Sequence, residues 1–425
     1  MSTEVDFYNY NKLTKACDSL AFGEVLLIVG DTCKGKTRFA HRFCSTHKQV
    51  LFLPFKGYDV SLIPSLMISE HKSWNEYLSN IIEVGEYDYL LIDDADCGKN
   101  SVGFWTALNE LCKNGMKLKI ILTANEEISD MPEHKTAYLT LRSWKALSDH
   151  LDISGKEIKE LLCITGCFPE IMAEYKRHCP LEETLNLLLE PGSAFATLAP
   201  RLMAQHFNTV DTYNTILYAI ALGNNTLTDI AKLAGMKYNA CLEYLKNLQS
   251  KGFVRSRDPR KGPREFYITN SYLYLWYLFV YDVRRRNGSA DIKEISADID
   301  LELRKNIYPR FLRSLFIDYA GHQFHYLDIP SGAYDQDKDI NGIYYDYVGD
   351  NGDYKVFLKC GYLKTEDVTK ATNVLRKIPF YNKQFVFFFT NKSIPQGCWT
   401  LSKTYDNIYI VQEKSLYRML GVPCE

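Results

Sequence analysis

The sequence lacks several features that mark secreted, membrane-bound and zinc-binding proteins. Its N-terminus, MSTEVDFYNYNK, has neither the basic segment nor the apolar segment of a signal peptide. The longest aromatic and apolar run, 272–281, is about half the length of a membrane span. Twelve cysteines are scattered without a Cys-x-x-Cys pair, which argues against a zinc site or a disulfide framework. We therefore expect a soluble, cytoplasmic protein with reduced thiols and no membrane contact.

An excess of charge of one sign is also absent. The chain has 50 Lys and Arg against 52 Asp and Glu, a net charge of −2, so any nucleic-acid site must be a local patch. A length of 425 residues is enough for about three domains, and 46% hydrophobic residues provide an ordinary globular core.

The pattern Gly-x-x-x-x-Gly-Lys-Thr follows the apolar run 25–29 and is typical of a phosphate-binding P-loop. The loop residues are Gly30, Asp31, Thr32, Cys33, Lys34, Gly35, Lys36 and Thr37. Glycines let backbone N–H groups approach phosphate oxygens, Lys36 supplies a charge for the β- and γ-phosphates, and the Thr37 hydroxyl is a Mg²⁺ ligand. A helix-compatible segment from Lys36 to about Phe43 points its positive end at the same anion. We expect these residues and Arg38 to bind ATP, since strand, loop and helix in this order favour a nucleotide site over a chance glycine-rich turn.

A second strand-like run, 88–92, ends in Asp93 and Asp94. This is the Walker B arrangement, in which Asp93 holds Mg²⁺ directly or through water. Asp94 stands where many such ATPases carry a Glu that polarises the attacking water, and its shorter side chain predicts slower hydrolysis without loss of binding. An isolated acidic pair is usually a solvated strand end, but its place downstream of a P-loop favours the metal.

A third strand-like run, 118–123, leads into Thr123-Ala124-Asn125. Thr123 or Asn125 can orient the water beside the γ-phosphate, and Asn125 is our catalytic candidate alongside Lys36 and Asp94. The alternative is a strand cap or an Asx turn. Candidate strands at 25–29, 49–53, 88–92 and 118–123 alternate with helical stretches at 73–84 and 101–114. Residues 1–150 therefore predict an α/β P-loop NTPase core with a parallel sheet.

Residues 151–207 are rich in Leu, Glu and Lys at helical spacing and predict a helical lid, with Asp152 or Ser154 as a helix cap. The lid contains the turn Gly166-Cys167-Phe168-Pro169, which opens a helix.

In this order, the chain resembles the archaeal-type P-loop ATPases, members of the STAND branch close to AAA+. Those proteins carry a P-loop, an acidic strand end, a polar sensor strand and a Gly-Gly-x-Pro turn near the nucleotide base. Here Cys167 replaces the second glycine, the Phe-x-Gly-Arg-x-x-Glu box is missing near the start, and no arginine finger can be named. The resemblance covers the chain to about residue 285 and extends more faintly beyond. It implies a winged helix after the ATPase and a C-terminal domain like a restriction endonuclease.

Residues 208–285 have helices and strands of the lengths and order expected for that winged helix. Helical segments at 211–222, 226–234 and 237–251 precede strands at 252–257 and 265–268, with 237–251 as the recognition helix. DNA phosphates would be contacted in a salt-sensitive manner by Lys237, Lys246, Arg257, Arg260, Lys261 and Arg264. The alternative is a packing or protein-interaction module, since the recognition helix also carries Glu243. The aromatic run 272–281 is expected in the core.

Residues 300–425 match the order of an α/β restriction-endonuclease-like domain but not its chemistry. A helix at 305–320 precedes strands at 340–347 and 354–359, a helix at 366–377 and a strand at 384–390. The active form of that domain needs an Asp on one strand and Glu-x-Lys on the next. Asp339 or Asp346 can supply the first acid, but the next strand ends Lys359-Cys360-Gly361 without a carboxylate. We expect a catalytically dead domain.

Three functions remain open from the sequence. The first is a switch that binds ATP and Mg²⁺, hydrolyses slowly, and couples nucleotide state to a DNA or protein partner or to a homo-oligomer. The second is a winged-helix DNA-binding module in which nucleotide is a structural ligand. The third, and least favoured, is a metal-dependent nuclease.

Overall fold

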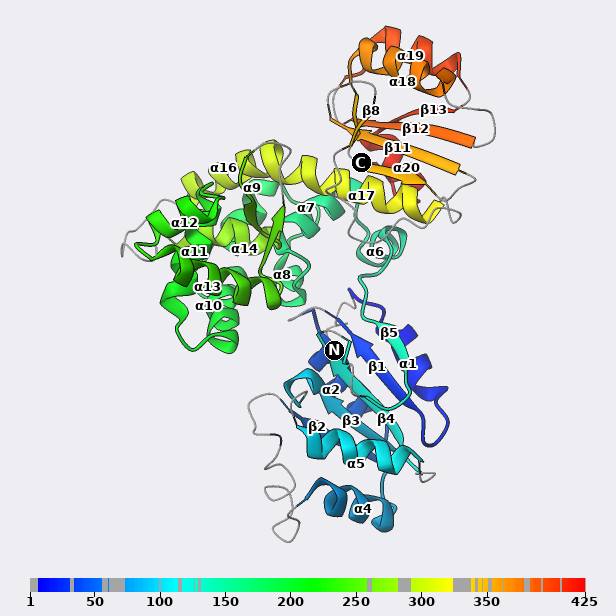
Figure 1. Ribbon diagram of the computed structural model, residues 1–425, viewed down its shortest axis with the longest axis vertical. Helices are drawn as coiled ribbons and strands as arrows, with labels where there is room; N and C mark the ends of the chain where they lie inside the picture. The colour runs from blue at the N-terminus through cyan, green and yellow to red at the C-terminus, as the bar shows by residue number, and fades with distance from the viewer. Residues whose placement is uncertain are drawn as a thin grey trace. The chain divides into compact units, whose positions relative to one another are not determined.

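The computed structural model describes residues 7–30, 34–55, 60, 73–98, 101–113, 117–125, 127–128, 131–257, 262–281, 292–323, 338–340, 343–345, 347–350, 354–361, 363–377, 383–390, 393–405 and 407–424. The chain forms two compact units, which are described separately below (Figure 1). The first comprises Met1–Ser143 together with the short segment Cys167–Pro169, and the second comprises Trp144–Gly166 and Glu170–Glu425.

A parallel five-stranded sheet forms the centre of the first unit, in the order β2-β3-β4-β1-β5. Its strands are β1 (Val25–Val29), β2 (Val50–Pro54), β3 (Tyr89–Asp93), β4 (Lys119–Ala124) and β5 (Lys135–Tyr138). The four predicted strands are confirmed within a residue or two, and the α/β class is confirmed with them. The parallel five-stranded sheet is consistent with a P-loop NTPase fold. The edge strand β5 was not expected, because its sequence KTAY is short and has no apolar run. In the structure this strand is largely exposed.

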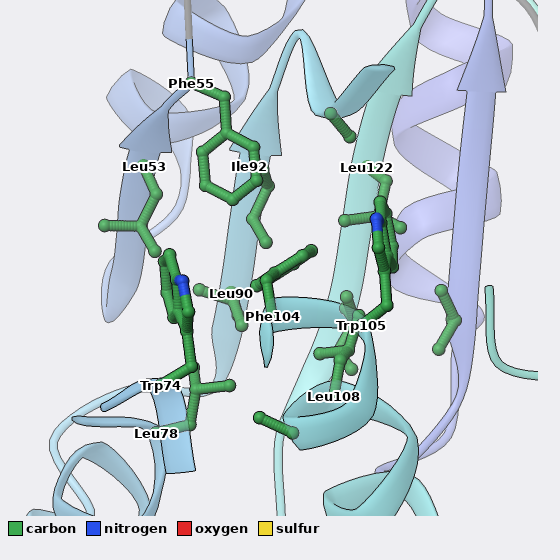
Figure 2. Close-up of a cluster of buried hydrophobic side chains, with 14 of the residues drawn as sticks. Leu53, Phe55, Trp74, Leu78, Leu90, Ile92, Phe104, Trp105, Leu108 and Leu122 are labelled. Atoms are coloured by element: carbon green, nitrogen blue, oxygen red, sulfur yellow. The ribbon is translucent and has the colours of Figure 1, made fainter. Parts of the chain in front are cut away.

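One face of this sheet is covered by α4 (Trp74–Val84) and α5 (Val102–Lys113), both close to their predicted ranges. Figure 2 shows Trp74, Phe104 and Trp105 from these helices packed on apolar side chains of the strands. The buried indole nitrogens are satisfied, since Trp74 Nε1 donates to the Val60 carbonyl and Trp105 Nε1 to the Gly98 carbonyl, each at 3.0 Å. This core holds the strands in place.

The opposite face is covered by α1 (Tyr10–Asp18) and α2 (Lys36–Thr46). The ring of Phe43 on α2 lies edge-on to Tyr89 of β3, with centroids 5.2 Å apart, and Phe39 lies 6.0 Å from Tyr10 of α1. The helix that follows the P-loop therefore packs on the sheet through Phe43 and on α1 through Phe39.

The second unit begins with five helices: α6 (Trp144–Leu151), α7 (Gly155–Thr165), α8 (Pro169–Glu174), α9 (Leu181–Leu188) and α10 (Ala194–His206). Of the two residues expected to cap a helix, Ser154 does so. Its side chain accepts from the Glu157 N–H, and Glu157 bonds back to the Ser154 N–H, so a full capping box starts α7.

Three further helices and an antiparallel hairpin follow: α11 (Val210–Ala221), α12 (Leu227–Leu233), α13 (Tyr238–Ser250), β6 (Val254–Arg257) and β7 (Glu265–Ile268). The next helical segment consists of α14 (Ser271–Leu275) and η3 (Trp276–Tyr281). Its rings lie in the core as expected, with Tyr272 and Tyr277 fully buried. The Tyr272 hydroxyl donates to the Phe195 carbonyl and accepts from the Ala199 N–H, both at 2.8 Å.

The remaining elements are α16 (Ile292–Glu302), η4 (Leu303–Ile307), α17 (Tyr308–Gln323), β8 (Lys338–Ile340), β9 (Ile343–Tyr345), β10 (Tyr347–Asp350), β11 (Tyr354–Cys360), α18 (Thr365–Lys377), β12 (Lys383–Thr390), α19 (Gln396–Lys403), β13 (Ile408–Gln412) and α20 (Glu413–Met419). Strands β10 to β13 form a sheet in that order, and β8 and β9 form a separate pair.

The prediction of one strand over 340–347 is wrong. This stretch contributes to three short strands, and β8 reverses direction into β9, with Ile340 paired antiparallel to Ile343. The two residues between them are Asn341 and Gly342, the commonest sequence of a two-residue hairpin connection. That signal should have broken the predicted strand.

Candidate functional site

The polar strand ends predicted from the sequence meet at one edge of the first sheet. Strands β1, β3 and β4 are parallel, and their register places Ile28 beside Thr123 and Ile92 beside Leu122. Their carboxyl ends are therefore level, which brings the start of the loop, Asp93 and the residues after β4 to the same edge.

The described part of the loop shows why both glycines are needed. Gly35 caps α2 with φ +101°, and a Cβ added there would lie 2.2 Å from the Tyr10 hydroxyl oxygen. That hydroxyl donates to the Gly35 carbonyl at 3.1 Å. A Cβ at Gly30 would lie 2.9 Å from the Leu139 Cβ. The intervening predicted residues Asp31, Thr32 and Cys33 lie outside the described residues.

Lys36 is buried at the first position of α2, with only 4% of its surface exposed. Its Nζ donates to the Gly30 carbonyl at 2.7 Å, which ties the end of the loop to its start. It also donates to Asn125 Oδ1 at 2.7 Å. Two residues predicted for catalysis are thus in direct contact. A buried ammonium at a helix N-terminus is a site for an anion, because it adds a full positive charge to that of the helix dipole.

The Walker B aspartate is buried and held by the neighbouring strand. Asp93 is 3% exposed, and its Oδ1 accepts a hydrogen bond of 2.5 Å from the hydroxyl of Thr123, which is fully buried. The same hydroxyl accepts from the Asp94 N–H at 3.0 Å. Thr123 therefore holds the Asp93 carboxylate and the backbone of Asp94, while Asn125 contacts Lys36, so the two sensor candidates have different partners.

Asp94 is half-buried and adopts a left-handed backbone conformation, with φ +55°. Asp is among the few residues other than glycine that tolerate this conformation. The turn directs the chain from β3 into the short 3₁₀-helix η2 (Ala95–Gly98).

The oxygen donors of this edge suit Mg²⁺ together with phosphates. Thr37 lies exposed on the first turn of α2, next to Lys36, and Asp93 offers a buried carboxylate. No group of three or more Asp, Glu, His or Cys side chains that could hold a metal occurs among the described residues. Mg²⁺ in phosphate sites takes one or two carboxylate or hydroxyl ligands and completes its shell with phosphate and water, so this donor set fits.

The predicted Gly166-Cys167-Phe168-Pro169 turn places its last three residues in the first unit. The Lys34 Nζ lies 4.5 Å from the centre of the Phe168 ring, and the Tyr8 hydroxyl donates to the Cys167 carbonyl at 2.5 Å. Cys167 has φ +61°, the conformation that glycine adopts most easily.

Two contributors to the site were missed from the sequence. Tyr10 holds the Gly35 carbonyl, and Asp96 Oδ2 accepts from Asn125 Nδ2 at 2.6 Å. Asp96 is in the DDAD run, so proximity to the Walker B pair was an available signal. Nothing local marks Tyr10, which reaches the loop only through the packing of α1 on α2.

Two of the basic residues proposed to contact DNA form ion pairs within the protein. Arg257 contacts the Glu265 carboxylate through Nη2 at 2.8 Å and Nε at 2.9 Å, and Lys246 pairs with Glu243 at 2.8 Å. Lys237 and Arg264 are exposed, whereas Arg260 and Lys261 lie outside the described residues. The pairs reduce the positive charge that the hairpin and α13 can offer to phosphates.

In the C-terminal sheet, Lys359 near the end of β11 pairs with Asp367 on the first turn of α18, at 2.9 Å. Asp339 lies on β8, outside that sheet, and Asp346 lies outside the described residues. Separately, no helix in the described part of the chain has the length and apolar character needed to cross a bilayer.

No protein-family model matches the chain. A curated protein of Methanocaldococcus jannaschii, the uncharacterized protein MJECL04, is 25% identical over 322 residues, which cover 67% of this chain and 71% of that protein. Among solved structures, the chain is similar to Aeropyrum pernix ORC1 in complex with DNA, at 15% identity and a TM-score of 0.37, over 67% of this chain and 95% of that one. It is also similar to Drosophila ORC bound to AT-rich DNA and Cdc6, at 13% identity and a TM-score of 0.22, over 63% of this chain and 92% of that one. TM-scores this low do not establish a shared fold, so the P-loop NTPase assignment rests on the sheet and loop of the chain itself.

Proposed function

We propose that the chain is a nucleotide switch that binds ATP with Mg²⁺ at residues 30–38 and couples its nucleotide state to a DNA or protein partner. The observation that carries this proposal is the position of Lys36. Its ammonium is buried at the N-terminus of α2, 2.7 Å from the carbonyl that begins the loop, at the edge where the buried Asp93 ends its strand. This arrangement provides positive charge for a triphosphate and a carboxylate for its metal at one edge of the sheet.

The protein residues then have distinct tasks. Lys36 leaves the Gly30 carbonyl to bind the β- and γ-phosphates, and Thr37 and Asp93 hold the Mg²⁺, which neutralises phosphate charge when bound. Thr123 keeps the Asp93 carboxylate oriented through their 2.5 Å hydrogen bond. Asp94 and Asn125 orient water, and the short Asp94 side chain makes hydrolysis slow.

The coupling part of the proposal concerns the segments after the core. We assign residues 151–207 as a lid, 208–285 as a winged helix and 300–425 as a degenerate nuclease-like domain. Three helices followed by the β6-β7 hairpin support the winged helix. The contact of Phe168 with Lys34 supports a lid that senses the loop, because the turn after α7 lies against the residues that close around a nucleotide.

The winged-helix DNA-binding module with a purely structural nucleotide is the alternative, but the ion pairs of Arg257 and Lys246 count against it. Each carboxylate partner lowers the net positive charge that the hairpin and α13 present to DNA phosphates, and phosphate neutralisation drives such binding.

Calorimetric titration with ATP and Mg²⁺ tests the nucleotide site. Replacing Lys36 by Ala removes the buried charge, so we expect the affinity for ATP to fall about 10- to 100-fold, the range for losing a charge-assisted hydrogen bond. The matched control is Lys48→Ala, an exposed lysine beyond the end of α2, which should bind ATP like the wild type. Unchanged ATP binding by the Lys36→Ala variant refutes the proposal.

A further inference from the structure

A third carboxylate after the Walker B strand contacts the candidate sensor. Asp96 lies in η2, two residues beyond Asp94, and its Oδ2 accepts a hydrogen bond of 2.6 Å from Asn125 Nδ2. The other end of the same amide, Oδ1, accepts from Lys36 Nζ at 2.7 Å. A continuous chain of hydrogen bonds therefore runs from Asp96 through Asn125 to Lys36 and on to the Gly30 carbonyl.

The partners at both ends determine which way the Asn125 amide points. An ionised carboxylate only accepts hydrogen bonds and an ammonium only donates them, whereas a primary amide has one accepting end and one donating end. Turning Asn125 over would set its NH₂ against the Lys36 ammonium and its oxygen against the Asp96 carboxylate. Both contacts would then be repulsive, so the observed orientation is enforced from both sides.

Asp96 has a limited choice of partners within the described residues. Asn125 is the hydrogen-bond partner found for its Oδ2, and its Oδ1 is a buried oxygen for which the described residues provide none. A buried acceptor without a donor loses its hydration without replacement, so this Asp96 oxygen costs stability, and the cost calls for a functional explanation.

We propose that Asp96 is a positioning residue that commits Asn125 to present its carbonyl oxygen, and not its NH₂, to the phosphate-binding loop. This inference rests on the proposed nucleotide function and deepens it. When Lys36 turns to the phosphates, the Asn125 oxygen, which faces the loop, accepts a hydrogen bond from the attacking water. Asn125 then orients the water as an acceptor, and it does not act as a donor to the γ-phosphate.

A reciprocal exchange of the two side chains tests the orientation. In Asn125→Asp, two carboxylates meet across the 2.6 Å contact and must share a proton, so this variant should melt at a lower temperature without nucleotide, with a deficit that shrinks as the pH is lowered. In the double variant Asp96→Asn, Asn125→Asp, the amide at position 96 donates to the carboxylate at position 125, whose other oxygen faces Lys36. The melting temperature should return toward that of the wild type.

Steady-state phosphate release separates positioning from folding. In Asp96→Asn the amide at position 96 no longer enforces one orientation of Asn125. We expect kcat to fall about tenfold, while KM and the calorimetric Kd for ATP stay within about twofold. A group misplaced near the reacting atoms lowers the rate more than the binding affinity. The matched control is Asp88→Asn, at the opposite end of β3, which should leave kcat unchanged.

The two proposals fail in different ways. Wild-type protein that binds no ATP overturns the nucleotide function, while the melting series without nucleotide still reports on the orientation of Asn125. Wild-type kcat in Asp96→Asn, or a double variant that melts no higher than Asn125→Asp alone, overturns the positioning role and leaves the Lys36 test intact.

Discussion

At the residue scale, Gly35 meets two separate restrictions. Its φ of +101° is disfavoured for any residue with a Cβ, and that Cβ would also collide with the Tyr10 hydroxyl at 2.2 Å. The next nearest Tyr10 atom, Cζ, is 3.5 Å from the same position, which is an ordinary contact. The collision therefore depends on a single oxygen atom, and the two restrictions can be separated by mutation.

Urea unfolding of Gly35→Ala, Tyr10→Phe and the double variant measures each restriction. We expect Gly35→Ala to lower the free energy of unfolding by two contributions: roughly 1–2 kcal/mol from the left-handed conformation of a residue with a Cβ, and the cost of the collision with the Tyr10 hydroxyl. Tyr10→Phe loses the hydrogen bond to the Gly35 carbonyl, about 1 kcal/mol. The double variant should be more stable than the sum of the two losses predicts, because the collision disappears with the hydroxyl. Additive losses would show that the loop moves away from Tyr10 at no cost.

At the element scale, α7 is joined to the C-terminal segment within the second unit. The Lys159 Nζ pairs with Glu413 at 2.6 Å, with 9% of the Lys159 side chain and 25% of the Glu413 side chain exposed. The Tyr417 hydroxyl donates to the same carboxylate at 2.5 Å, and burial and this carboxylate raise the pKa of Tyr417 far above its usual value, so the phenol stays protonated. The Gly155 N–H donates to the Pro423 carbonyl at 2.7 Å. The helix that leads into the Gly166–Pro169 turn is thus anchored at its first residues by α20 and the segment after it.

Breaking this ion pair should destabilise the second unit strongly. Glu413→Ala leaves the buried Lys159 ammonium without its carboxylate, and we expect a loss of about 3–5 kcal/mol in the free energy of unfolding, reduced somewhat by the partial exposure of Glu413. The double variant Lys159→Met, Glu413→Leu should lose much less, because no buried charge remains. Glu243→Ala is the matched surface control, since its pair with Lys246 is 59% and 70% exposed and should contribute less than about 1 kcal/mol. Equal losses for the buried and the surface pair would contradict this account.

At the scale of the whole molecule, the C-terminal sheet bears on the question of nuclease activity. The lysine near the end of β11 is already paired with Asp367, and that strand end, Lys359-Cys360-Gly361, carries no carboxylate. Asp339 belongs to a separate strand pair. A divalent metal held for hydrolysis needs more than one acidic ligand, so the proposed role of this region is binding and not cleavage.

Supercoiled plasmid DNA incubated with the full chain and Mg²⁺ or Mn²⁺ should stay intact, because the strand end Lys359-Cys360-Gly361 offers no carboxylate to a metal. Agarose electrophoresis measures the outcome, and nicking that disappears in Asp339→Ala would establish the nuclease instead. Phosphate release from ATP in the same mixtures separates the other two functions. The switch releases phosphate in a manner that depends on Lys36. The DNA-binding module binds the plasmid without releasing phosphate.

The sequence by itself determined the parts of the molecule that local spacing encodes. A glycine-framed loop between an apolar run and a helix, an acidic strand end and Thr123 before Asn125 were sufficient to predict four strands. They also predicted that Gly30, Lys36, Asp93, Thr123 and Asn125 lie at one edge of the sheet. Parallel strands end at the same edge of a sheet, so the convergence followed from the strand assignment. The Asn-Gly pair at 341–342 is also a turn signal in the sequence, and the prediction of one continuous strand there overlooked it.

Only the tertiary structure decided which partner each polar group has. The DDAD run placed Asp96 close to the Walker B pair, but its contact with the Asn125 amide depends on the turn after β3, and Tyr10 reaches Gly35 only because α1 packs on α2. Arg257 and Lys246 appeared in the sequence as cations for DNA, but the hairpin and helix geometry pairs them with Glu265 and Glu243. The physical reason is that hydrogen bonds and ion pairs act over a few ångströms, and distances between residues far apart in the chain are set by packing, which local sequence patterns do not contain.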